Sequence, residues 1–107
     1  MKLPKKIRIG CFDYDVRFVD DLRDLQNNRL WGNHVPAEQK INIDKSIPSE
    51  QRVVVVLWHE ILHALFDHFD IQENAKEEYL VDTLSQGITM VLKDNPTFRK
   101  YVLESLK

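Results

Sequence analysis

The sequence predicts an α+β fold in which a small antiparallel sheet of three or four strands packs on one long helix, a following antiparallel helix and a short C-terminal helix. Three observations support this class. Segments in which apolar and polar residues alternate, as they do in strands, all lie before residue 45. Segments with apolar residues at helical spacing all lie after residue 48. With 107 residues, 43% of them hydrophobic and 30% charged, the chain has the size and composition of one globular domain, residues 1–107.

Four strands are expected in the first part of the chain. They cover residues 6–10, 14–18, 30–35 and 39–44. The first two form a hairpin through a turn at residues 10–13, because Ile7 and Ile9 alternate with basic residues and the second segment alternates in the same way. In the fourth strand, Ile41 and Ile43 alternate with polar neighbours, which is typical of a strand with one buried face.

Three helices are expected after residue 48. The first covers residues 49–69, with Ser49 as its N-cap. The β-branched residues at 53–56 favour a strand by propensity alone, but the helical spacing of the apolar residues that follow favours a helix. The second helix ends near residues 95–96, and the third covers residues 97–106. The apolar stripe of the second helix consists of Val81, Leu84, Ile88, Val91 and Leu92.

The composition argues against two classes of partner. The chain carries 15 basic and 17 acidic side chains and a formal net charge of −2, so it has no overall attraction to nucleic acid or to an anionic membrane. The basic residues between Lys2 and Arg8 could bind DNA but are more typical of a solvated strand edge. No apolar segment approaches the ~20 residues of a membrane span, and no secretory signal is visible. Together with the single Cys11, these features predict a cytoplasmic protein that binds neither membrane nor nucleic acid, and they leave the oligomeric state open.

Residues 59–63, with the sequence HEILH, form the metal-binding motif HExxH. On a helix, His59 and His63 lie about one turn apart on the same face, so both imidazoles can bind one zinc ion. On a strand they would lie about 13 Å apart, and one ion could not bridge them. Glu60 is placed to take a proton from a water molecule activated by the metal. The motif therefore predicts zinc as the cofactor, the two histidines as ligands and Glu60 as the catalytic base.

A catalytic zinc ion normally has three protein ligands, so one more is expected. Two candidates follow the motif on the same helix. Asp67 would have to lean two turns back toward His59, whereas helical side chains tilt toward the N-terminus by only part of a turn. His68 is rotated away by about 100° from Asp67. Neither is expected to reach the metal.

The next helix offers acidic side chains at residues 77, 78 and 82. If this helix returns antiparallel from a turn near residues 70–71, Glu78 is level with His63 and Asp82 is level with His59. Glu77 is rotated by about 100° from Glu78, so only one of the two can face the metal. The alternative for all three is an ordinary solvated first turn that is stabilised by the helix dipole.

The region around the motif resembles a known family. The resemblance lies in LWHEILHAL, in the following EEYLVDTLSQGI through VLKDNP, and in the preceding LWGNHVPAEQKINID. These segments, within residues 30–96, are similar to the small phage- and prophage-encoded relatives of the ImmA/IrrE-type zinc metallopeptidases. Such proteins belong with the gluzincins, in which HExxH is followed by a glutamate on a later helix, often with an aspartate four residues beyond it. Glu78 and Asp82 match that spacing.

The resemblance implies a small zinc metallopeptidase of phage or prophage origin, in the cytoplasm of a bacterial host, that hydrolyses a peptide or protein. It implies Glu78 as the third metal ligand beside the two histidines of the motif. It also implies that the substrate backbone pairs with the strand at 39–44, next to the motif helix. His34 and Tyr79 are candidates for hydrogen-bond donors to the oxyanion.

A second class of function stays open. The chain could be a non-catalytic phage or prophage protein with a structural or vestigial metal site that acts by binding a partner. The small size of the chain favours this hypothesis, because few residues remain for a substrate cleft. The intact Glu60 favours the peptidase, because a purely structural site has no use for a base. Trp31 and Trp58 are expected in the core rather than against a substrate.

Overall fold

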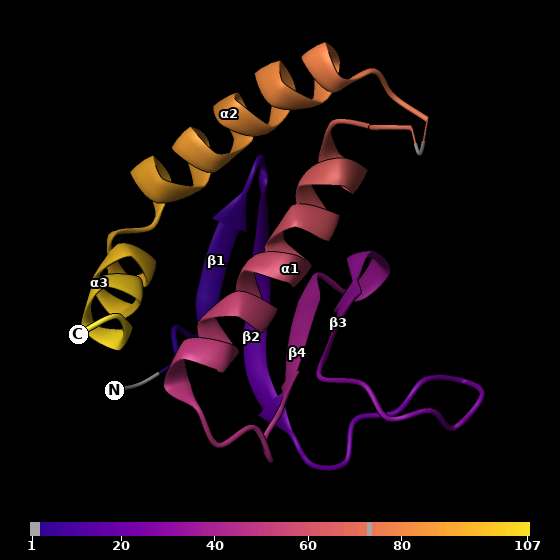
Figure 1. Cartoon of the computed structure of the whole chain (residues 1–107), viewed down its shortest axis with the longest axis vertical. Coiled ribbons are helices and arrows are strands. Elements are labelled where there is room, and N and C mark those ends of the chain that lie inside the picture. Colours follow the sequence, from indigo (N-terminus) through magenta and orange to yellow (C-terminus); the bar gives the residue numbers. More distant parts are fainter. Residues whose placement is uncertain (1–2, 73) are drawn as a thin grey trace.

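The structure, a computed structural model that describes residues 3–72 and 74–107, is an α+β fold with its strands before its helices (Figure 1). The strands are β1 (Lys6–Ile9), β2 (Phe12–Val19), β3 (Gly32–Val35) and β4 (Lys40–Asp44), and the helices are the short 3-10 helix η1 (Pro36–Glu38), α1 (Glu50–His68), α2 (Glu77–Asp94) and α3 (Pro96–Ser105). The predicted fold class is confirmed. The side chain of Val81, predicted in the apolar stripe of α2, and the whole of Lys2 lie outside the described residues.

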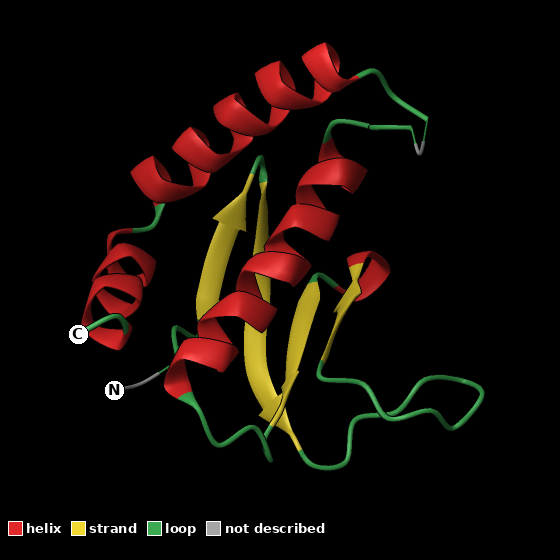
Figure 2. Cartoon of the chain, viewed as in Figure 1, coloured by secondary structure: helices red, strands yellow, loops and turns green. Residues whose placement is uncertain are grey.

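The four strands form one mixed sheet in the order β1-β2-β4-β3. The neighbours β1 and β2 are antiparallel, as are β3 and β4, but β2 and β4 are parallel. The expectation of a purely antiparallel sheet was therefore wrong. The long connection between β2 and β3, drawn as a loop in Figure 2, places β3 one strand away from β2 and leaves the position next to β2 for β4. The hairpin of β3 and β4 then folds back, so that β4 pairs with β2 and β3 becomes an edge strand.

The two edges of the sheet differ. The side chain of Asn95 covers the edge of β1: the backbone N–H of Arg8 donates to its Oδ1 at 2.8 Å, and its Nδ2 donates to the carbonyl of Arg8 at 2.9 Å. At the other edge, the N–H of Asp44 donates to the carbonyl of Trp31, so these two residues form a hydrogen-bonded pair of the antiparallel β3–β4 ladder. Hydrogen-bonded and non-hydrogen-bonded pairs alternate along such a ladder, and the next residue, Gly32, belongs to a non-hydrogen-bonded pair. The backbone N–H and C=O groups of Gly32 and His34 therefore point away from β4, and the edge of β3 can accept another strand.

Helix α1 lies across one face of the sheet and forms the centre of the core (Figure 1). The hydroxyl of Ser49 accepts a hydrogen bond from the N–H of Arg52 at 3.2 Å, which confirms the predicted N-cap. The β-branched run is helical because three of its four valines, all except Val55, are buried in the core. The buried strand residues below it include Ile7, Ile9, Ile41 and Ile43, as the alternation predicted. Trp58 packs edge-on against Phe98, with ring centroids 5.2 Å apart.

Helix α2 contacts α1 in a different register from the predicted one. A Cβ atom on Gly87 would lie 2.9 Å from Leu65 and 3.2 Å from Phe69, so Gly87 faces the C-terminal end of α1. A turn at residues 70–71 would instead have placed Gly87 beside the N-terminal part of α1. The connection between the helices is longer than that turn, so α2 starts beyond the end of α1 and leads toward β1 and α3 (Figure 1).

The strands expose basic residues on the face of the sheet opposite α1. Lys6 and Arg8 are exposed on β1, and Arg8 pairs with Asp13 across the hairpin at 3.4 Å. Both side chains are therefore solvated, and the choice between a solvated strand and DNA binding stays a prediction. No helix within residues 3–72 and 74–107 has the length and apolar character that a membrane crossing requires.

Asp44, at the end of β4, should make the stability of the fold sensitive to acid. Its side chain is 1% exposed, and its Oδ2 accepts from Arg29 at 3.2 Å and from Ser46 at 3.0 Å. Burial alone would raise the pKa of Asp44, but the hydrogen bonds from Ser46 and Arg29 outweigh this effect and hold the pKa below its usual value. Because the folded state lowers the pKa, the stabilisation is present above the ordinary aspartate pKa of about 3.9 and is lost as the pH falls through the lower folded value.

We therefore expect Asp44→Asn to lower the free energy of unfolding at pH 7 by about 1–3 kcal/mol. The variant should also lose less stability than the wild type when the pH is lowered from 7 to 3. Urea unfolding at both pH values measures the two effects. Asp13→Asn, which changes an exposed pair, is the control and should leave stability nearly unchanged. Equal losses on acidification for wild type and Asp44→Asn would contradict this role of Asp44.

Candidate metal centre and groove

The two histidines of the motif converge on one point outside α1. They are four positions apart on the helix, and their Nε2 atoms lie 3.1 Å apart, with ring centroids at 4.7 Å. Two nitrogens bound at ~2.05 Å to a tetrahedral zinc ion would be roughly 3.3 Å apart. His59 and His63 are both exposed on this side of the helix. The pair therefore fits half of a tetrahedral zinc site, with its remaining positions open to the outside.

The electrostatics of the pair favour the form that binds a metal. Although His63 is exposed overall, partial burial of its imidazole lowers its pKa, and the positive charge of His59 lowers it further. A lowered pKa keeps the imidazole neutral at neutral pH, and a neutral imidazole has the free nitrogen lone pair that a metal needs.

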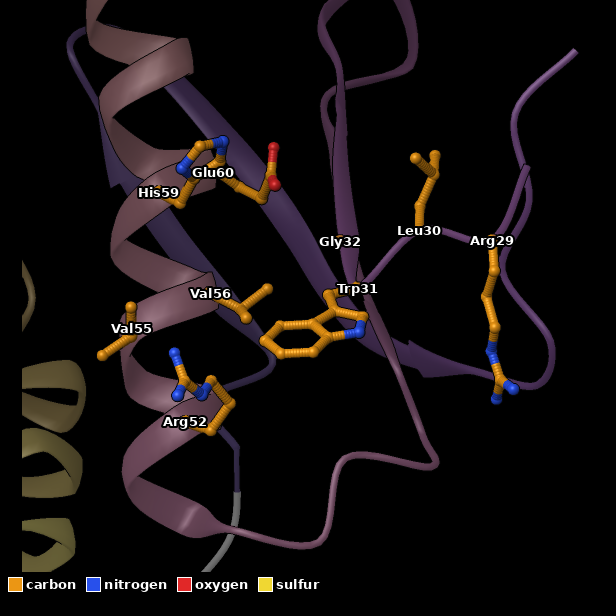
Figure 3. Close-up of a pocket in the computed structure, with 9 residues that line it drawn as sticks. All are labelled: Arg29, Leu30, Trp31, Gly32, Arg52, Val55, Val56, His59 and Glu60. Atoms are coloured by element: carbon orange, nitrogen blue, oxygen red, sulfur yellow. The ribbon is translucent and has the colours of Figure 1, made fainter. Parts of the chain in front are cut away.

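Glu60 is a largely buried residue whose carboxylate faces β3 and lines the hollow beside it (Figure 3). The residue is only 5% exposed, and it has no hydrogen-bond or ion-pair partner among the described residues. Burial raises the pKa of Glu60, while the neighbouring His59 lowers it in part. In Figure 3 its carboxylate points from α1 toward Gly32. A Cβ on Gly32 would lie 3.1 Å from Oε2 of Glu60 and 2.7 Å from Val56, so glycine allows the backbone of β3 to come this close to the carboxylate.

The structure does not bring the predicted third ligand to the two histidines. Within residues 3–72 and 74–107, no three His, Cys, Asp or Glu side chains come together as a metal-binding group. Glu77, Glu78 and Asp82 are exposed on α2, which starts beyond the end of α1. Asp67 lines the same hollow as the two histidines. The assignment of Glu78 stays a prediction.

A groove runs along α1 beside β3 and passes the motif. It consists of two adjoining hollows of about 400 and 480 Å³, which share Leu30, Gly32, His59 and Glu60. We call the hollow toward the N-terminus of α1 the lower arm; it is also lined by Arg29, Trp31, Arg52, Val55 and Val56 (Figure 3). The upper arm is also lined by Asn33, His34, Pro36, His63 and Asp67. The candidate metal centre thus lies in the middle of an elongated groove rather than at a closed end.

Of the two predicted oxyanion donors, one lies at this groove. His34 lines the upper arm together with His63, and its Nε2 lies 3.2 Å from the hydroxyl of Tyr14. Burial lowers the pKa of His34, and His63 adds to this effect, while Asp67 opposes it. Tyr79 is exposed on α2 and lines neither arm.

Three features of the site differ from the sequence prediction or were absent from it. The edge strand beside α1 is β3, whereas the predicted substrate strand, β4, is paired on both sides. Trp31 was expected in the core, but it is 54% exposed and lines the lower arm. Arg52 was not singled out, although a basic residue in the first turn of a helix is at the unfavourable end of its dipole, and that signal is readable from sequence.

Comparisons with known proteins add no identification. No protein-family model matches the chain, and no curated protein or solved structure gives a significant match.

Proposed function

We propose that this protein is a small zinc-dependent peptidase of the HExxH type. The observation that carries the proposal is the convergence of the Nε2 atoms of His59 and His63 at 3.1 Å, beside Glu60, a largely buried residue that lines the same groove. The groove and the open edge of β3 add a place for an extended peptide. The resemblance to phage- and prophage-type ImmA/IrrE metallopeptidases supports the same class, and the lone Cys11 agrees with action in a bacterial cytoplasm.

In this proposal, each part of the site has one task. A zinc ion held by His59 and His63 would supply a Lewis acid and would lower the pKa of water. Glu60 accepts the proton of the attacking water and delivers it to the leaving amine. The backbone of β3 holds the peptide extended, through the outward N–H and C=O groups of Gly32 and His34. The side chain of His34 can donate a hydrogen bond to the developing oxyanion.

The first test of the proposal measures zinc and cleavage on the same sample. We expect one zinc ion per chain by emission spectroscopy, and cleavage of a mixture of unstructured peptides that mass spectrometry detects. Chelation should abolish the cleavage, and added zinc should restore it. A protein that retains zinc but cleaves no peptide would favour the alternative, a partner-binding protein with a structural metal.

The third ligand can be identified by zinc affinity. We expect Glu78→Ala to weaken zinc binding by about tenfold or more, because the metal would lose an anionic ligand. Glu77→Ala, on the neighbouring position of α2, should change the affinity little. Competition with a chromogenic chelator measures both variants and Asp67→Ala. A loss for Asp67→Ala alone would move the third ligand to α1, and a loss for Glu77→Ala alone would contradict the choice between the two glutamates.

A further inference from the structure

We propose that the lower arm of the groove binds a peptide segment in which an acidic side chain follows or precedes an apolar one, with Arg52 as the residue that selects the acidic group. This inference rests on the proposed function, because it names the class of substrate for the same groove.

The guanidinium of Arg52 is held at the groove without an acidic partner. It lies over the ring of Trp31, 5.3 Å from the ring centroid, and both residues line the lower arm (Figure 3). Stacking on an indole fixes the direction of a guanidinium without using its N–H donors. Among the described residues no carboxylate lies within ion-pair distance of Arg52. Its donors are therefore available to a carboxylate from outside.

The stability of α1 does not explain a cation at this position. Arg52 lies in the first turn of the helix, where the dipole already supplies positive potential and favours an anion. The acidic residue of that turn, Glu50, is turned away and accepts a hydrogen bond from Tyr101 of α3 at 3.1 Å. The other arginine of the arm, Arg29, is bound to Asp44. Arg52 thus adds a positive charge, unpaired among the described residues, to the lining of the groove, although the whole chain has a net charge of −2.

The remaining lining of the lower arm is mostly apolar. Trp31 is 54% exposed and Val55 is 56% exposed, so both offer surface that an apolar side chain can cover. A carboxylate beside such a surface would come from a side chain rather than from a chain terminus. The reason is that the groove does not end at Arg52, since a third hollow, lined by Trp31, Arg52 and residues 46–49, continues beyond it.

The spacing places this subsite relative to the reacting bond. Arg52 and His59 are seven positions apart on α1, which corresponds to about 10 Å along the helix axis. An extended peptide covers this distance in roughly three residues. The acidic residue should therefore lie about two to three residues from the cleaved bond.

The experiment uses acetylated and amidated octapeptides of alanine and leucine that carry a single glutamate, glutamine or lysine at each position in turn. Hydrolysis is measured as kcat/KM for the zinc-loaded protein. Binding is measured separately with the Glu60→Gln variant, through the change in tryptophan emission, in a protein that also carries Trp58→Phe so that Trp31 is the one tryptophan left. The full chain carries Arg52, Arg52→Gln or Arg52→Glu. The matched control is Arg17→Gln, which removes an exposed arginine from β2, on the face of the sheet away from α1.

We expect the best glutamate peptide to exceed its lysine counterpart by about tenfold or more. Arg52→Gln should remove this preference, Arg52→Glu should reverse it, and Arg17→Gln should leave it intact. A preference that survives Arg52→Gln, or no preference at all, overturns the inference. A glutamine peptide with a free C-terminus that equals the glutamate peptide would also overturn the choice of a side chain. If the protein hydrolyses peptides without a charge preference, the inference about Arg52 is rejected and the proposed function stands. If it binds glutamate peptides preferentially but neither holds zinc nor hydrolyses them, the proposed function is rejected and the inference stands.

Discussion

Replacing Glu60 with glutamine should abolish peptide hydrolysis while leaving the fold and the bound zinc intact. Glutamine keeps the shape of the side chain but cannot accept a proton from water, and loss of a positioned general base lowers rates by about 10²–10⁴-fold. The free energy of unfolding should stay equal or rise slightly. The reason is that Glu60 is only 5% exposed and burial raises the pKa of its carboxyl group, so a neutral amide is easier to place there than a charge.

Three measurements on one preparation check this prediction: kcat/KM for the best peptide, zinc per chain, and urea unfolding. Glu104→Gln is a matched control, because Glu104 lies on α3, pairs with Lys107 and does not line the groove. It should retain full activity. A Glu60→Gln variant that cleaves peptides at the wild-type rate would show that Glu60 is not the base.

The sequence predicts α1 well because several independent signals agree there. The cap at Ser49, the helical spacing of the apolar residues and the HExxH motif all require the same helix. The opposing signal, the strand propensity of residues 53–56, is overridden because the sheet provides a surface on which branched side chains pack. Local pattern and tertiary packing therefore agree on the helix that places His59 and His63 one turn apart, while their role as zinc ligands stays a prediction.

The sheet was harder to predict because alternation identifies strands but not their neighbours. Ile41 and Ile43 mark a buried face of β4 whether this strand lies at an edge or in the centre. Only the folding back of the β3–β4 hairpin makes β3 the edge beside α1. Gly32, Trp31 and Arg52 line a groove beside that edge. The unfavourable position of Arg52 on its helix is readable from sequence, but the groove that these residues share could not be assigned before the order of the strands was known.

The position of α2 depends on the connection that precedes it. Antiparallel register was predicted from a tight turn, but the longer connection places Gly87 against Leu65 and Phe69. The identity of the third ligand depends on this single offset, because each residue of slippage rotates the side chains of α2 by about 100°. The acidic residues of α2 are readable from sequence, whereas their distance from the motif is not.

The second large effect concerns zinc and stability. We expect His59→Ala to abolish zinc binding and, with it, the stabilisation that zinc gives to the folded chain. A ligand that binds only the folded state at a hundred times its Kd adds about 2.7 kcal/mol to the free energy of unfolding. For a domain of this size, that corresponds to a rise in Tm of about 10 °C or more. Without zinc, wild type and variant should melt within a few degrees of each other, because His59 is exposed and surface substitutions change stability little.

Thermal melts of both proteins, with added zinc and with a chelator, measure this difference. His68→Ala is the matched control on the same helix: His68 packs beside Gly10 and Phe69 instead of facing the metal centre. This variant can melt at a lower temperature than the wild type, since it loses that contact, but it should keep the full zinc-dependent rise in Tm. The decisive quantity is therefore the shift caused by zinc, and not the Tm itself. A wild-type melt that does not respond to zinc or chelator would rule out a stabilising metal at His59 and His63, whereas a shift that persists in His59→Ala would place the metal elsewhere.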